Sequence, residues 1–252
     1  MRPRLFIGWD PRQMAAYVVA HFSAGAAGSG VDIERLALAP LVRRGLYTRP
    51  TRYQGEDGSP GYWDVISDAP MSTGHAISRF LVPTLAGFKG WALFTDGDVL
   101  FRRSVRDLFA LADSRFSIQV VQHDYAPLES AKMDGQQQTR YFRKNWSSVM
   151  LFNCEHPANA ALTPDLVNAV PGRDLHRFCW LEDRLIGSLP QEWNFLVGHT
   201  PATIDPAIVH FTEGVPDTPG YEHCLYADEW YATARAAGYR LSRPPRPEEE
   251  VA

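Results

Sequence analysis

The chain has 252 residues, of which 45% are hydrophobic and 12% aromatic, so it can bury a sizeable core as one large domain or two small ones. Its formal net charge is −4 and its basic residues are scattered, which argues against nucleic acid as a main partner. No stretch approaches the roughly 20 apolar residues that a membrane-spanning helix needs. Peripheral membrane contact stays open, because a lipid-linked substrate can be reached from the cytoplasm without a span.

The cysteines and the N-terminus indicate the compartment. Cys154, Cys179 and Cys224 are widely spaced and form no C-x-x-C motif, which argues against a zinc ribbon or a disulfide framework. The apolar run at residues 5–9 is too short for the core of a signal peptide. We therefore expect a cytoplasmic protein.

The first part of the chain has the pattern of a β-α-β unit. Residues 5–9 form an apolar strand, Asp10 can cap a helix that begins at Pro11, and residues 31–36 alternate as a second strand does. Residues 48–72 are rich in Gly, Pro, Asp and Ser, and they predict a long irregular loop.

Helices and strands alternate again from residue 74 onward. The pattern predicts helices over 74–85, 105–112, 157–170 and 227–237, and strands over 91–95, 116–122, 147–153 and 208–211. No internal repeat and no clear linker interrupts the chain. We therefore expect a single α/β domain with a long, irregular C-terminal half.

Two aspartates follow the strand predicted over 91–95, in the segment Leu93-Phe94-Thr95-Asp96-Gly97-Asp98-Val99-Leu100. Residues i and i+2 of an extended segment point the same way, so Asp96 and Asp98 can face one ligand. Gly97 has no Cβ and lets the backbone approach that ligand closely. Ligands of open α/β sheets lie at the carboxyl ends of the strands. The pair therefore suits a divalent cation with a diphosphate, although Asp-Gly is also ordinary turn chemistry.

His210 offers a third ligand of another type. It lies at the end of a short apolar strand, and the Gly- and Pro-rich segment 214–220 follows it. An imidazole with two carboxylates suits Mn²⁺ better than Mg²⁺ or Ca²⁺, which favour shells made only of oxygen. The alternative for His210 is a structural histidine.

Four blocks in order resemble the metal-dependent glycosyltransferases of the GT-A fold. The resemblance is closest to family 8, which includes bacterial galactosyl- and glucosyltransferases and glycogenin. The blocks are residues 5–10, Ile77-Ser78-Arg79-Phe80-Leu81-Val82-Pro83, residues 94–100, and Ile208-Val209-His210-Phe211-Thr212-Glu213-Gly214. Between them, residues 148–153 resemble the strand under the sugar pocket, and residues 180–194 resemble the acidic segment with its L-P-x-x-W-N continuation. The resemblance implies a Rossmann-like, mixed but mostly parallel sheet flanked by helices.

The resemblance also implies a role for particular residues. The implied ligands of Mn²⁺ (or Mg²⁺) are Asp96, Asp98 and His210. The residues implied to bind the nucleotide-sugar donor are Gly8, Asp10, Arg79, Asp96 and Gly97. The alternative for Asp10 is its helix cap, and for Arg79 an ordinary surface ion pair.

Glu182 and Asp183 are the candidates for catalysis, because a carboxylate there could orient sugar hydroxyls or act as a general base. Solvated surface charges are their alternative. The segment 140–146 is basic and aromatic and could face an acceptor.

The chain departs from the family pattern at three places. Trp146-Ser147-Ser148 stands where the family has Asn-Ala-Gly, and Leu181 stands where its first acidic aspartate would be. The Gly-x-x-Lys that follows the histidine is missing, so no lysine contact to the distal phosphate carries over.

The leading hypothesis is transfer of a hexose from a nucleotide sugar, with UDP expected, to a saccharide or glycoconjugate acceptor. If family 8 is the right kin, the anomeric configuration is retained. The nucleotide-binding part is then expected over residues 1–122, the sugar and acceptor part over 123–242, and a disordered tail over 243–252.

Two alternatives stay open. A nucleotidyltransferase of similar fold would carry a Gly-rich loop with Arg and Lys after the first strand, where this chain has Gly8-Trp9-Asp10-Pro11-Arg12. A non-catalytic nucleotide-sugar-binding protein would bind the donor without turnover.

Overall fold

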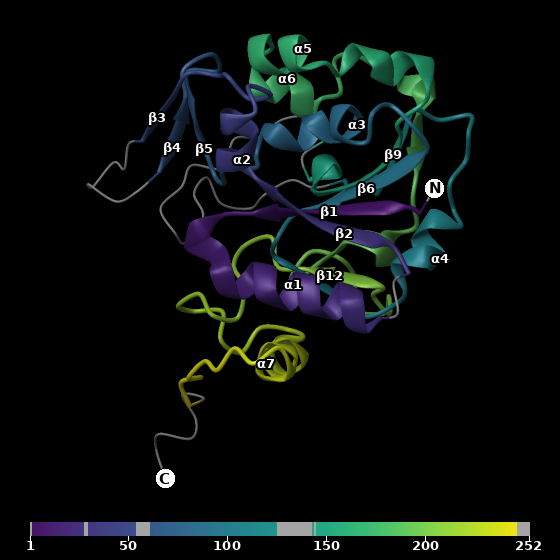
Figure 1. Ribbon diagram of the computed structural model, residues 1–252. Helices are drawn as coiled ribbons and strands as arrows, with labels where there is room; N and C mark the ends of the chain where they lie inside the picture. Colours follow the sequence, from purple (N-terminus) through teal and green to yellow (C-terminus); the bar gives the residue numbers. More distant parts are fainter. Residues whose placement is uncertain (1, 28–29, 54–60, 125–142, 144, 246–252) are drawn as a thin grey trace.

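A six-stranded sheet forms the centre of the computed structural model, which describes residues 2–27, 30–53, 61–124, 143 and 145–245 (Figure 1). Its lateral order is β10-β8-β9-β6-β1-β2. Only β9 runs antiparallel to its neighbours, so the predicted mixed and mostly parallel sheet is confirmed. The strands are β1 (Arg4–Trp9), β2 (Asp32–Ala37), β6 (Trp91–Thr95), β8 (Ile118–Val120), β9 (Val149–Asn153) and β10 (Ile186–Ser188).

The inner strands β1, β6, β8 and β9 of this sheet are buried on both faces, which explains why their residues are mainly apolar. Along β6, Ala92 and Phe94 enter one hydrophobic cluster while Leu93 enters another on the opposite face. Helices α3 (Val82–Leu85), α5 (Pro164–Ala169) and α6 (Gly172–His176) lie on one side of the sheet, and α1 (Met14–Ala26) lies on the other (Figure 1).

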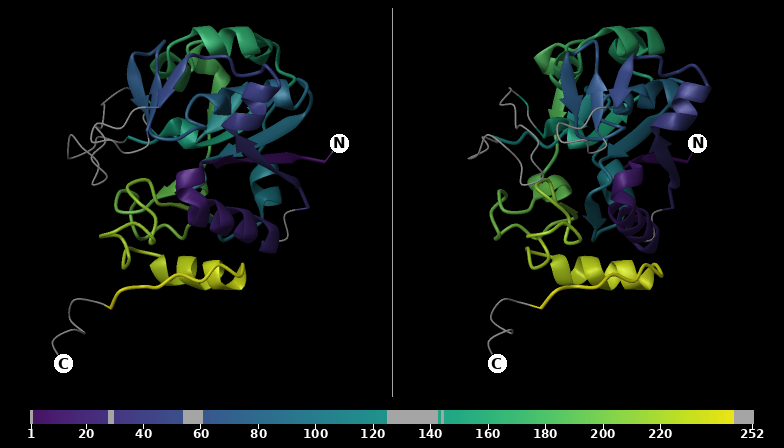
Figure 2. Two further views of the ribbon diagram at one scale, coloured as in Figure 1. Left: turned by 60° about the vertical axis from the view of Figure 1, so that its left-hand side comes forward. Right: turned by 90° about the vertical axis from the view of Figure 1, so that its left-hand side faces the viewer.

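A second, three-stranded sheet lies beside the first, with the order β11-β12-β7. It consists of β7 (Val99–Phe101), β11 (Phe195–Leu196) and β12 (Ile208–His210). Trp230 of helix α7 (Ala227–Ala236) lies in one hydrophobic cluster with Val19 of α1 and Val209 of β12. Figure 2 places α7 at the end of the molecule opposite α5 and α6.

The region predicted as a long irregular loop, residues 48–72, instead contains a three-stranded antiparallel sheet. Its strands are β3 (Thr51–Tyr53), β4 (Tyr62–Asp64) and β5 (Ala69–Met71), and residues 54–60 lie outside the described part. Strands of three residues are too short to show a clear alternation of apolar and polar residues. The Gly and Pro residues between them give the segment the composition of a loop.

Two predicted helices are each divided into two shorter helical segments in the structure. The segment 157–170 divides into η4 (Pro157–Ala161) and α5, because Pro164 lacks an N–H and restricts the residue before it. The segment 74–85 is helical only as the 3₁₀ turn η2 (Ser78–Leu81) followed by α3, whose second residue is Pro83. The remaining elements are η1 (Pro11–Gln13), α2 (Leu38–Arg43), α4 (Val105–Phe109), η3 (Trp146–Ser148), η5 (Asp183–Leu185) and η6 (Gln191–Asn194).

The sequence also predicted that no helix spans a membrane and that residues 243–252 form a disordered tail. None of the helices in the described ranges is long and apolar enough to cross a membrane. At the C-terminus, Arg243 donates to the carbonyl of Glu222 at 2.8 Å, while residues 246–252 lie outside the described part.

Candidate functional site

The loop that carries the two aspartates joins the two sheets. Strand β6 ends at Thr95 in the large sheet, and β7 begins at Val99 in the small one. Asp96 donates its N–H to the carbonyl of Ser148 at 2.9 Å, and the carbonyl of Asp98 accepts from Phe211 N at 3.0 Å. Each aspartate is therefore fixed to a different sheet.

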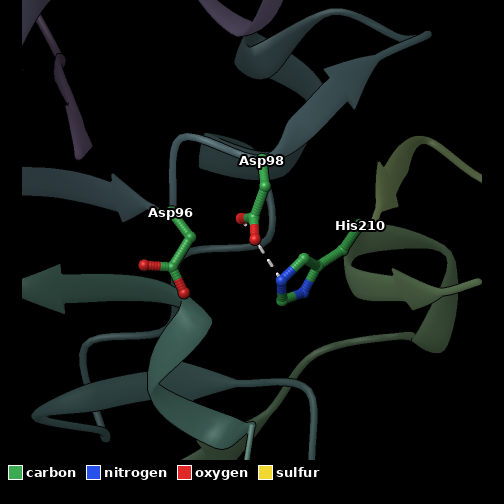
Figure 3. A group of neighbouring side chains, drawn as sticks. All are labelled: Asp96, Asp98 and His210. Atoms are coloured by element: carbon green, nitrogen blue, oxygen red, sulfur yellow. Dashed lines mark ion pairs between the residues drawn. The ribbon is translucent and has the colours of Figure 1, made fainter. Parts of the chain in front are cut away.

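Strand β12 brings His210 to this loop, since His210 pairs with Val99 in the antiparallel register of β12 and β7. One ligand atom from each of Asp96, Asp98 and His210 lies within 4.8 Å of the other two. Figure 3 shows the three side chains converging, with His210 Nε2 3.4 Å from Asp98 Oδ1. The structure thus gathers the three ligands that the resemblance implies.

The atoms of this cluster fit a divalent cation. Asp98 Oδ1 is buried and accepts no hydrogen bond from the described residues. A buried carboxylate oxygen without a partner is costly, and a cation would remove that cost. Two carboxylates and one imidazole form a donor set that Mn²⁺ accepts.

Asn194 orients the imidazole of His210. Its Nδ2 donates to Ser148 Oγ at 2.9 Å and to the carbonyl of Asn145 at 3.3 Å, and its Oδ1 lies 2.9 Å from His210 Nδ1. A carbonyl can only accept, so the amide nitrogen must face Asn145 and the amide oxygen must face His210. His210 Nδ1 therefore carries the proton, and Nε2 presents its lone pair to the aspartates.

Asp96 is held by Arg79 from the segment before β6. Arg79 Nη2 lies 2.7 Å from Asp96 Oδ1, and Arg79 Nη1 donates to Asp96 Oδ2 at 3.1 Å. Burial by itself raises the pKa of Asp96, but the Arg79 charge and the hydrogen bond with His75 outweigh it and keep that pKa well below its ordinary value. Arg79 is 5% exposed, so it is no ordinary surface ion pair. Its contact with a donor stays a prediction.

Asp10 is engaged as a helix cap. Its Oδ1 accepts from Arg12 N at 2.9 Å, and its Oδ2 accepts from Gly74 N at 2.8 Å. Arg12 also pairs with both oxygens of the buried carboxylate. These bonds confirm the capping alternative, and the contact of Asp10 with a nucleobase stays a prediction.

Gly8 and Gly97 bring the two neighbouring strands close together at the site. A Cβ on Gly97 would lie 2.5 Å from the carbonyl oxygen of Gly8, and a Cβ on Gly8 would lie 2.5 Å from the ring of His75. Glycine at both positions thus permits β1 to approach the aspartate loop. A direct approach of either backbone to the donor stays a prediction.

Gly97→Ala is expected to destabilise the protein by about 1–3 kcal/mol, because the new methyl group meets rigid backbone. Gly25→Ala is the matched control, since Gly25 lies within α1 and a Cβ there meets nothing within 4 Å. That substitution should leave stability unchanged or raise it by up to about 1 kcal/mol. Urea unfolding measures both, and equal stabilities of the two variants would refute the packing role of Gly97.

Glu182 and Asp183 are surface carboxylates in the structure. The Asp183 side chain is 86% exposed and pairs with Arg143, while Glu182 is 67% exposed and pairs with Arg184 at 2.8 Å. Their catalytic role stays a prediction. In the predicted acceptor segment 140–146, residues 140–142 and 144 lie outside the described part.

The comparisons with known proteins concern the fold and the family. No family model matches the chain. Among solved structures, galactosyltransferase LgtC in complex with donor and acceptor sugar analogues aligns with a TM-score of 0.55 at 15% identity, covering 98% of this chain and 99% of LgtC. The bifunctional glycosyltransferase WbbM gives a TM-score of 0.58 at 13% identity, covering 92% of this chain but 49% of WbbM.

The glycosyltransferase GlyE of Streptococcus pneumoniae TIGR4 aligns with a TM-score of 0.57 at 15% identity, covering 92% of this chain and 60% of GlyE. The chain thus spans about half the length of WbbM and less than two thirds of GlyE. These likenesses confirm the GT-A fold, while membership of family 8 stays a prediction. Protein CDI of Arabidopsis thaliana is 43% identical over 233 residues, which cover 90% of this chain and 84% of that protein. The chain therefore has the GT-A fold and belongs to the same family as Protein CDI.

Proposed function

We propose that this protein is a metal-dependent glycosyltransferase that moves a hexose from a nucleotide sugar to a saccharide or glycoconjugate acceptor. The observation that carries the proposal is the convergence of Asp96, Asp98 and His210 at the carboxyl end of β6. Ligands of open α/β sheets bind at that end. The GT-A fold adds support, because LgtC, of the same fold, was solved with donor and acceptor sugar analogues.

Each residue of the cluster contributes a property that a metal-diphosphate site needs. Asp98 offers Oδ1, which accepts no hydrogen bond from the described residues, and His210 offers Nε2 in the tautomer that Asn194 selects. Asp96 stays anionic because Arg79 is bound to both of its oxygens. When bound, Mn²⁺ or Mg²⁺ would neutralise the charge that develops on the leaving diphosphate.

Glycosyl transfer is favoured over nucleotidyl transfer by the segment after β1. A nucleotidyltransferase would use basic side chains there to hold phosphates, but Arg12 is bound to Asp10 and to the carbonyl of Ser72 at 2.8 Å. Asp10 and Arg12 thus join this segment to the chain before η2. UDP as the nucleotide and retention of configuration are further parts of the proposal, and they rest on the resemblance to family 8.

A cytoplasmic location is also part of the proposal. Cys154, Cys179 and Cys224 are all unbridged, which supports a reducing compartment. Peripheral contact with a lipid-linked acceptor is compatible with this location.

A screen of nucleotide sugars by thermal shift, with Mn²⁺ or with a chelator, tests the proposal. At a donor concentration of about 100 times Kd, binding adds about 2.7 kcal/mol, which corresponds to a rise in Tm of about 5–10 °C. The rise should appear only with Mn²⁺, and slow hydrolysis of the same donor should accompany it. If no nucleotide sugar raises Tm in a metal-dependent way, the proposal fails, and binding without hydrolysis would favour the non-catalytic alternative.

A further inference from the structure

A second side chain, His75, holds Asp96 together with Arg79. His75 is 1% exposed, and its Nε2 lies 3.1 Å from Asp96 Oδ1. Arg79 lies one turn further along, and its Nε donates to the carbonyl of His75 at 3.4 Å. The two residues therefore approach the same carboxylate from one rigid segment, which also contains η2.

Strand β1 fixes the imidazole in this place. A Cβ on Gly8 would lie 2.5 Å from Cδ2 and 2.6 Å from Nε2 of His75, so the ring packs directly on the backbone of β1. The ring of Phe94 lies 6.2 Å from the imidazole, between centroids. Packed in this way, the ring has little freedom to turn away from Asp96.

The surroundings also identify the proton that His75 offers. Its Nδ1 is buried and has no partner among the described residues, whereas Nε2 faces a carboxylate oxygen. A carboxylate can only accept, so Nε2 must carry the proton and donate it. Nδ1 then carries only a lone pair. Burying this acceptor without a partner costs less free energy than burying a second N–H without a partner.

The two donors act unequally on the oxygens of Asp96. Oδ1 accepts from His75 Nε2 at 3.1 Å, and it also lies 2.7 Å from Arg79 Nη2 in the ion pair. Among the residues that the structure describes, Oδ2 accepts only from Arg79 Nη1. Oδ1 thus has two nitrogen neighbours and Oδ2 has one, so Oδ2 has more room for another partner, and His75 is the residue that creates this difference.

We propose that His75 is a positioning residue that turns Asp96 so that Oδ2 faces the cation, an inference that rests on the proposed metal site. His75 itself does not touch the cation. A hydrogen-bond partner of a metal ligand contributes 10- to 100-fold to metal affinity in known sites, and we expect a contribution of that order here. Arg79 supplies the charge that keeps Asp96 ionised, and His75 supplies its orientation.

The test compares His75→Gln with His75→Met in the full-length protein. The two side chains have the same length and nearly the same shape, but only Gln retains an N–H where His75 has Nε2. The affinity for Mn²⁺ alone is measured from the electron paramagnetic resonance signal of the free ion, and Tm without metal reports folding. The Gln variant should bind Mn²⁺ within about threefold of the wild type, and the Met variant should bind it about tenfold or more weakly.

The outcomes separate this inference from the proposed function. If the wild type binds Mn²⁺ and the Gln and Met variants bind it equally well, the role of His75 is refuted while the metal site stands. A wild-type protein that binds no Mn²⁺ refutes the proposed function itself. If the Met variant has a lower Tm, His75→Leu serves as a second variant without a donor, and full Mn²⁺ affinity in either folded variant contradicts the proposal.

Discussion

Asp98→Asn is expected to reduce turnover of the nucleotide-sugar donor about 10³-fold while leaving the fold intact. The substitution replaces an anionic ligand by a neutral amide of the same shape. Loss of the cation's charge stabilisation costs several kcal/mol, and each 1.36 kcal/mol is a factor of ten in rate. Asp98 Oδ1 has no hydrogen-bond partner among the described residues, so the amide breaks no bond of that oxygen.

Donor hydrolysis at saturating Mn²⁺ measures this effect, and circular dichroism with Tm measures the fold. Asp113→Asn is the matched control, because Asp113 is a carboxylate that pairs with Arg115 at the surface, at 2.5 Å. The control should keep the wild-type rate. A wild-type rate in Asp98→Asn would remove Asp98 from the metal site.

Arg49→Met is expected to destabilise the protein by about 3–5 kcal/mol, the largest stability effect that the described structure suggests. Arg49 and Asp64 form an ion pair in which both side chains are fully buried. Arg49 Nη1 also donates to the carbonyls of Val167 and Val170 at 2.8 and 2.7 Å, where α5 ends. Removing Arg49 leaves the Asp64 carboxylate buried without its counter-charge and leaves these carbonyls without their donor.

Urea unfolding compares this variant with Arg103→Met. Arg103 also pairs with an aspartate, Asp205, but its side chain is 41% exposed and that of Asp205 is 68% exposed. Exposed pairs contribute about 0–1 kcal/mol, so the control should unfold close to the wild type. If both variants lost the same free energy of unfolding, the Arg49–Asp64 pair would not be what holds β3, β4 and β5 to α5.

The large sheet could be predicted from the sequence because its strands are buried on both faces. The runs that form β1, β6 and β9 are continuously apolar and bounded by polar residues, so their positions were predicted to within one or two residues. The sheet of β3, β4 and β5 could not be predicted in the same way. Its strands have only three residues each. The Arg49–Asp64 ion pair beside it joins residues that are 15 positions apart in the sequence and that come together only in the folded protein.

The candidate site, like the fold, could be predicted only in part from the sequence. Spacing placed Asp96 and Asp98 on one loop. His210 was predicted to join them from its position at the end of an apolar strand and from the resemblance, because the pairing of β7 with β12 is not visible in the sequence. Asn194 and His75 were missed. Asn194 lay within the recognised L-P-x-x-W-N segment, and His75 stands four positions before Arg79, but neither position indicates which atom the side chain contacts.

The proposed role of Asp96, Asp98 and His210 is to hold a divalent cation together with a nucleotide diphosphate. The most direct test is anomalous diffraction at the manganese edge from crystals grown with Mn²⁺ and UDP. We predict one strong peak between the two carboxylates and His210 Nε2, with diphosphate density next to it and UDP along the carboxyl end of β1 and β6. A crystal that contains ordered UDP but no manganese among these three residues would contradict the account.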